Sequence, residues 1–124
     1  MPYVIVNHDP SLKKKQLLKI KEVLKHSCAE ALDCSDTDPA GLLTPGAINV
    51  RFWPYGSADD KIFTLDILII SMHFASRVED LGERAAKIRD ELLWCGHLNP
   101  GSRVGVFPIC PPAGWAEGSI PNDL

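Results

Sequence analysis

Proline occupies the second position of the sequence, directly after Met1. Because this next residue is small and cyclic, we expect Met1 to be removed, which leaves the ring nitrogen of Pro2 as a free secondary amine. A free α-amino group titrates at about pH 7.7–8.0 and a secondary amine ordinarily higher, but partial burial beside apolar and cationic neighbours lowers the pKa toward neutrality. An amine poised there takes a proton from a hydroxyl or carbon and returns it elsewhere. Pro2 is therefore the leading candidate for acid–base catalysis; the alternative is a chance proline, since about 5% of residues are proline.

Arg77 and two polar residues of an expected strand are candidates for holding an anionic substrate. Arg77 follows Ser76 at the expected start of a helix, where its guanidinium and the helix N-terminal amides can hold an anion together. The alternative for Arg77 is a solvated surface arginine. Asn49 and Arg51 alternate on one face of a strand whose other face is apolar. These two side chains either face water or line a site between subunits.

No metal site is expected from the cysteines and histidines. The cysteines at positions 28, 34, 95 and 110 form no C-x-x-C pair, and no histidine lies at metal-ligand spacing from another. Cys28 and Cys95 fall within amphipathic helix patterns, where a free cysteine behaves as a small apolar residue. We therefore expect neither a metal nor another cofactor, and a reducing cellular compartment.

Hydrophobic periodicity predicts the elements that position these residues. Short runs rich in β-branched residues predict strands at residues 3–7, 47–53, 63–71 and 103–110. Apolar residues at helical spacing predict a first helix from a Ser11 cap to about Leu32. A second helix is predicted from Ser76, in a capping box with Glu79, to Gly96. Residues 33–45 are predicted to be a loop, and the tail 111–124, with three prolines and two glycines, a loop or arm.

This order doubles one β-α-β unit within a single domain, residues 1–124. The pseudo-repeats cover about residues 2–56 and 57–110, and the arm 111–124 follows. Since each β-α-β connection makes its two strands parallel and right-handed, the predicted fold class is α/β, with a four-stranded sheet and both helices on one face. The other face would be apolar and uncovered, which argues for self-association into a closed ring. The residues expected on this uncovered face are Ile5, Val50, Ile67, Ile69 and Val106.

Composition and charge exclude several classes of partner. The formal net charge of −3 gives no reason to expect nucleic acid, whose binding usually leaves a basic stripe. Six lysines between residues 13 and 25 fall on the polar side of the first predicted helix, which indicates a solvated helix face. No apolar run approaches the roughly 18 residues of a membrane span, and no basic region followed by an apolar one indicates a secretory signal. We therefore expect a cytoplasmic protein with no nucleic-acid or membrane partner.

A chain that begins Met1-Pro2, enters a strand at once and doubles a β-α-β unit resembles the tautomerase superfamily. It is most similar to the long-chain members, namely the 5-carboxymethyl-2-hydroxymuconate isomerases and the related malonate semialdehyde decarboxylases and cis-3-chloroacrylic acid dehalogenases. The likeness covers nearly the whole chain as architecture, and the matching residues are Met1-Pro2, Arg51 and Arg77. The isomerases carry an Arg-x-Arg step where this chain has Asn49-Val50-Arg51. One carboxylate-binding charge is therefore missing, and the substrate need not be the same dicarboxylate.

The resemblance implies a cofactor-free isomerase or tautomerase of aromatic-compound degradation that uses an N-terminal proline on a small 2-oxo or 2-hydroxy-dienoate acid. It also implies a homotrimer in which three sheets form a barrel and cover the apolar face. In such a trimer the arm can close over a neighbour's site, with Trp115 in contact and Glu117 orienting or activating a water; the alternative for Glu117 is an exposed carboxylate. A related hydratase, dehalogenase or decarboxylase with Pro2 as acid remains open, as does a non-catalytic small-ligand binding module.

Overall fold

The computed structural model describes residues 2–112 and 116–123. Within these residues the chain forms four strands and three α-helices, with short 3₁₀ turns at Pro39–Gly41 and Pro45–Ala47. In chain order the elements are β1 (Tyr3–His8), α1 (Lys14–Leu32), β2 (Asn49–Pro54), β3 (Leu65–Ile70), α2 (Ala75–Glu79), α3 (Leu81–Leu93) and β4 (Val104–Ile109). None of the described helices is long and apolar enough to cross a membrane.

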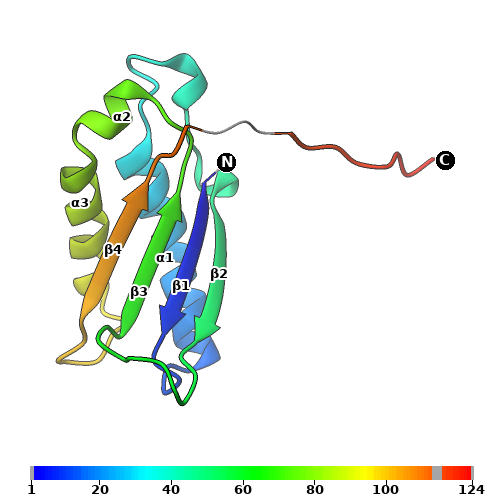
Figure 1. The fold of residues 1–124 in the computed structure, drawn as a ribbon. Coiled ribbons are helices and arrows are strands. Elements are labelled where there is room, and N and C mark those ends of the chain that lie inside the picture. The colour runs from blue at the N-terminus through cyan, green and yellow to red at the C-terminus, as the bar shows by residue number, and fades with distance from the viewer. Residues whose placement is uncertain (1, 113–115, 124) are drawn as a thin grey trace.

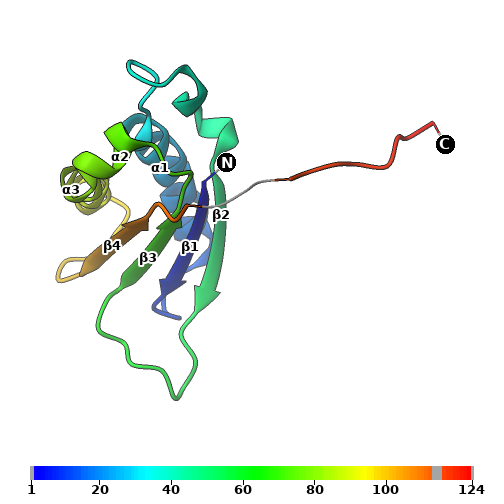
Figure 2. The same ribbon diagram turned by 45° about the horizontal axis from the view of Figure 1, so that its top comes forward.

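The four strands form one sheet in the order β2-β1-β3-β4. β1 pairs in parallel with β2, and β3 pairs in parallel with β4, whereas β1 and β3 meet antiparallel in the centre. Each β-α-β unit therefore keeps its own parallel pair, and the two units lie side by side. α1 and α3 cover one face of the sheet, and no described helix lies on the other (Figures 1 and 2). The predicted four-stranded α/β fold is confirmed.

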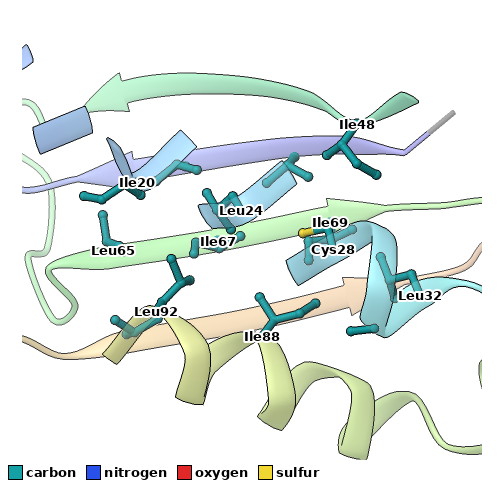
Figure 3. Close-up of a cluster of buried hydrophobic side chains, with 14 of the residues drawn as sticks. Ile20, Leu24, Cys28, Leu32, Ile48, Leu65, Ile67, Ile69, Ile88 and Leu92 are labelled. Atoms are coloured by element: carbon teal, nitrogen blue, oxygen red, sulfur yellow. The ribbon is translucent and has the colours of Figure 1, made fainter. Parts of the chain in front are cut away.

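The hydrophobic core fills the space between the two long helices and the sheet. α1 contributes Ile20, Leu24 and Cys28, and α3 contributes Ile88 and Leu92, all with no solvent exposure (Figure 3). Alternate strand residues point toward these helices, because side chains on a strand alternate between its faces. The strand residues with no exposure are Val4, Val6, Leu65, Ile67 and Ile69. Burial, with a contribution from the charge of Glu91, raises the pKa of Cys28 to about 12, so this thiol stays protonated within the core.

Four of the five residues predicted for the uncovered face lie on the helix-covered face instead. Ile67 and Ile69 are completely buried, and Val50 and Val106 pack against the same core. Ile5, between the buried Val4 and Val6, is the one placed correctly. The prediction was wrong because β3 is apolar at nearly every position, so its sequence does not indicate which alternate set faces the helices.

The uncovered face, called the open face below, is nevertheless apolar across its middle. Ile5 of β1 lies beside Leu68 of β3, and Leu68 lies beside Phe107 of β4. Ile70 and Ile109 form the next row, and Phe107 and Ile109 are 49% and 44% exposed. A contiguous patch of exposed apolar side chains favours contact with another protein surface.

The predicted Ser11 cap of the first helix is wrong. Ser11 lies ahead of the helix, and its N–H donates to the Asp9 carboxylate (2.9 Å). α1 begins at Lys14, and the preceding N–H, that of Lys13, donates to Gln16 Oε1 (3.0 Å). A glutamine at the third helical position therefore bonds the residue ahead of the helix, as in one half of a capping box.

The predicted capping box of the second helix is also wrong. Ser76 lies inside α2 rather than before it, and its hydroxyl donates to Asp38 Oδ2 (2.9 Å). The single helix expected here is two, α2 and α3, with a break at Asp80. Arg84 Nε donates to Asp80 Oδ1 across the first turn of α3 (2.6 Å), so Asp80 is held where the second helix starts.

Leu24→Ala is expected to lower the free energy of unfolding by about 2–5 kcal/mol, because it leaves a cavity between α1 and the sheet. Urea denaturation followed by circular dichroism measures the change. The matched control is Leu18→Ala on the same helix, where the side chain is 48% exposed and the expected change is within about 0.5 kcal/mol. Equal losses for the two variants would contradict the assigned core.

Candidate functional site

Pro2 lies at the end of the sheet, one residue before β1. β1 is a central strand with β2 on one side and β3 on the other. The carbonyl of Pro2 accepts a hydrogen bond from the Asn49 N–H (3.1 Å), which extends the β1–β2 pairing by one residue. Because the backbone is paired on this side, the direction in which the Pro2 ring projects is fixed by the sheet, and the ring is buried.

The Pro2 ring lines a hollow of about 160 Å³, called the Pro2 hollow below. Its walls come from the connection between α1 and β2 and from the connection between β3 and α2. The other lining residues are Ala40, Leu42, Leu43, Ala47, Met72, Phe74 and Arg77. Arg77 is the one charged residue among them. The structure therefore brings together two of the residues predicted for the site, Pro2 and Arg77, in an otherwise apolar setting.

Arg77 is buried, with 1% of its surface exposed, so the alternative of a solvated surface arginine is wrong. Its guanidinium donates to three backbone carbonyls: from Nε to Leu32 (2.7 Å), from Nη1 to Met72 (2.7 Å) and from Nη2 to Gly41 (3.3 Å). The Phe74 ring lies 5.1 Å from the guanidinium carbon. A guanidinium has five N–H donors in a planar fork, and three of them hold three separate chain segments together.

The end of α1 explains how this charge is tolerated without a carboxylate. Among the described residues no carboxylate lies within ion-pair distance of Arg77. Leu32 is the last residue of α1, and the last carbonyls of a helix have no partner within it. Arg84 Nη1 donates to the neighbouring carbonyls of Ala31 and Asp33 (both 2.9 Å). Two arginines thus cap the negative end of the helix dipole, where cations are stabilised.

The Asp33 carboxyl is affected by the same charge. Burial acts to raise its pKa, but hydrogen bonds from Ser35 and from the backbone of Leu43, together with the charge of Arg77, outweigh burial. The pKa of Asp33 therefore lies below its usual value, and this carboxylate is ionised at neutral pH beside the connection that lines the hollow.

The wall formed by residues 38–43 was missed by sequence reasoning, which treated it as part of a loop. Asp38 accepts a hydrogen bond from Ser76 of α2 (2.9 Å), and Gly41 accepts one from Arg77 (3.3 Å). A Cβ at Gly41 would collide with the sulfur of Cys34, so a larger residue here would force the Cys34 side chain to move. The acceptors for Arg77 are backbone carbonyls, which every residue carries and which therefore leave no pattern in the sequence. Gly41 is the one residue of this wall whose type gives a signal.

The other predicted site residues do not reach the Pro2 hollow within one protomer. Arg51 is exposed and lies beside Ile5 on the open face, and Asn49 lies beside Tyr3 on the same face. Glu117 is exposed in the segment 116–123, which extends away from the sheet (Figures 1 and 2). Trp115 lies outside the described residues. Among the described residues, no group of three or more acidic, histidine or cysteine side chains is close enough to hold a metal ion.

Comparison with known proteins finds similarity in structure but not in sequence. No protein-family model and no curated protein matches the chain. A solved structure described as "Q0 fused 4-OT wild type symmetric trimer" matches with a TM-score of 0.62 and 13% identity over 94% of each chain. MIF2 of Leishmania major matches with a TM-score of 0.53 and 21% identity over 93% of each chain. Pt0534 inactivated by 2-oxo-3-pentynoate matches with a TM-score of 0.57 and 16% identity over 94% of this chain and 93% of the other.

These neighbours are structures of the tautomerase superfamily. The chain has their fold over nearly its whole length, as the Met1-Pro2 start and the doubled β-α-β pattern implied. Identities of 11–21% show the fold alone, so the reaction and the subfamily are not given by the comparison.

Arg77→Ala is expected to lower the free energy of unfolding by roughly 3 kcal/mol or more, since hydrogen bonds to a charged group contribute about 1.5–3 kcal/mol each and three carbonyls lose their donor. Arg77→Lys retains the charge but not the planar fork, and is expected to lose nearly as much. Urea denaturation measures both.

The control for these variants is Arg89→Ala, which removes an exposed arginine paired with Asp90 and should change stability little. If Arg77→Ala were as stable as Arg89→Ala, the three carbonyl contacts would not hold the segments together.

Proposed function

We propose that this protein is a cofactor-free tautomerase or isomerase in which Pro2 moves a proton between carbon and oxygen of a small 2-oxo or 2-hydroxy-dienoate acid. The observation that carries the proposal is the shared hollow: Pro2 and the buried cation Arg77 line one apolar hollow at the sheet end of a tautomerase-type fold. Removal of Met1 turns the Pro2 nitrogen from an amide into a secondary amine. The apolar lining disfavours the charged amine, which brings its pKa toward neutrality.

In the proposed reaction, the neutral Pro2 nitrogen removes a proton from the substrate hydroxyl or carbon and the resulting ammonium returns it at the other position. Arg77 holds the substrate carboxylate chiefly by its charge, because three of its donors are already bound to carbonyls. Low local dielectric strengthens that attraction. The inactivation of Pt0534 by 2-oxo-3-pentynoate supports a 2-oxo acid as the substrate class, since this inactivator is itself a 2-oxo carboxylate.

The proposed assembly is a closed homotrimer. Two of the neighbours are described as symmetric trimers, and the open face of this chain carries apolar side chains that a ring of three would cover. In that ring Asn49 and Arg51 would line a surface shared between subunits and contribute to substrate binding. The arm would reach a neighbour's site, with Trp115 in contact and Glu117 orienting or activating a water. We place this enzyme in the cytoplasm, in the degradation of aromatic compounds.

Pro2→Ala is expected to lower turnover about 100-fold, near the lower end of the 10²–10⁴ range for acid–base groups, because a primary amine remains but is less well aimed. The readout is the ultraviolet absorbance of enolisable 2-oxo acids incubated with untagged protein. Pro10→Ala, at an exposed proline, is the control and should keep full activity.

Intact mass gives the second arm of this experiment. Active protein is expected to begin at Pro2, and a variant with one extra residue before Pro2 should lose more activity than Pro2→Ala, because its nitrogen is an amide and cannot act as a base. Retained Met1 in purified protein would favour the non-catalytic binding module. Full activity in the extended variant would rule out Pro2 as the base.

Leu68→Glu is expected to convert the trimer into monomers, because it places a charge in the middle of the open face. Light scattering of the native protein at micromolar concentration should report about three times 13.6 kDa. Lys87→Glu, on the outer helix layer, is the control and should stay trimeric. A native protein that scatters as a monomer would show that the open face is not a subunit interface.

A further inference from the structure

A second hollow region is lined by the first turns of α1 and the loop between α3 and β4. Both segments lie at the end of the sheet opposite the N-terminus (Figure 1). One part, of about 220 Å³, is lined by Lys15, Gln16, Lys19, Gly96, His97, Leu98 and Asn99. The adjoining part, of about 450 Å³, is lined by Leu93, Trp94, Leu98, Asn99, Pro100, Gly101 and Ser102. The two parts share Leu98 and Asn99 as lining residues, so they adjoin, and together they are called the Lys15 groove below.

The internal repeat relates the Lys15 groove to the Pro2 hollow. β1 and β3 begin at Tyr3 and Leu65, an offset of 62 residues, and they are antiparallel neighbours in the centre of the sheet. The Pro2 hollow is formed by the α1–β2 connection and the start of α2; the groove is formed by the α3–β4 connection and the start of α1. The same offset relates Arg77 to Lys15. Each half of the chain therefore places a cation at the equivalent position.

The lysines of the groove differ from Arg77 because, among the described residues, their side chains have no hydrogen-bond or ion-pair partner. Lys15 and Lys19 are exposed and one turn apart on α1, so their side chains are neighbours. Among the described residues, no hydrogen bond or ion pair engages the side chains of Lys15, Lys19, His97 or Asn99. Gln16 Nε2 donates to the His97 carbonyl (3.4 Å), which holds the loop against the helix. Two like charges one turn apart repel each other, and a bound anion would relieve that repulsion.

The other end of the groove is apolar and aromatic. Trp94 is 87% exposed and Leu93 is 39% exposed, at the end of α3. An exposed indole offers a flat apolar surface on which a ring can stack. The two parts of the groove together fall within the usual size of small-molecule sites, about 300–1,000 Å³.

We propose that the Lys15 groove binds a small amphipathic anion, with a flat aromatic body against Trp94 and a phosphate or carboxylate between Lys15 and Lys19. This site is distinct from the Pro2 hollow and lies at the opposite end of the sheet. Its binding does not depend on the proposed enzymatic activity, because none of its lining residues lines the Pro2 hollow.

Titration calorimetry with phenyl phosphate, phenylacetate, inorganic phosphate and phenol tests this proposal. Phenyl phosphate or phenylacetate is expected to bind at least tenfold more tightly than inorganic phosphate or phenol, because inorganic phosphate and phenol each fill only one part of the groove. The tighter binder of phenyl phosphate and phenylacetate identifies the anionic group. Lys15→Gln with Lys19→Gln should weaken that binding at least tenfold. Lys21→Gln with Lys25→Gln, on the same helix but outside the groove, changes the net charge equally and should stay within twofold.

Amide chemical shifts locate the ligand. The amides of Lys19, His97 and Leu98 are expected to move on titration, in the native protein and equally in Pro2→Ala, whose turnover is measured separately. Shifts confined to Met72 and Phe74 would overturn the proposal by placing the ligand in the Pro2 hollow. Equal weakening by the two lysine pairs, or binding of phenyl phosphate and phenylacetate no tighter than that of inorganic phosphate, would also overturn it, because either result indicates attraction to charge alone.

Discussion

The fork of Arg77 is the interaction on which the arrangement around Pro2 depends. Its three donors join the last turn of α1, the connection that follows it and the connection between β3 and α2. The β3–α2 connection is also tied to the sheet at its first residue, because the Ser71 N–H donates to the Ile109 carbonyl (3.0 Å). A buried guanidinium is costly unless its donors are satisfied, and here the helix end supplies carbonyls that need donors. The donors of Arg77 and the carbonyls that need donors satisfy one another. One side chain therefore both caps the end of α1 and holds the walls of the Pro2 hollow in place.

The Pro2 hollow and the open face separate the polar residues into two sets. Arg77 lies on the helix side, in the hollow that Pro2 also lines, whereas Asn49 and Arg51 lie on the opposite face of β2. Side chains on the two faces of a sheet point in opposite directions. Asn49 and Arg51 can therefore reach a Pro2 hollow only if that hollow belongs to another protomer. This geometry ties the proposed chemistry to the proposed ring.

The sequence predicted four strands, two β-α-β units and a sheet with its helices on one face, because apolar periodicity and repeat length determine these features. It did not predict which side of β3 faces the helices, since nearly every residue of that strand is apolar. The cap predicted at Ser76 failed for another reason. Serine bonds a nearby acceptor as readily as a helix end, and Asp38, 38 residues away, is the partner that Ser76 bonds. Partners brought in by tertiary structure leave no local pattern.

The repeat also has a chemical asymmetry. With the same offset of 62 residues, Pro2 at the start of β1 corresponds to Thr64 at the start of β3. The N–H of Thr64 donates to the Arg103 carbonyl (2.8 Å), and its hydroxyl accepts from the Arg103 N–H (3.0 Å). A nitrogen in the interior of a chain is an amide with no basic lone pair, whatever residue stands there. In a chain that doubles such a unit, only one of the two equivalent positions, Pro2 or Thr64, can therefore become a chain-terminal amine.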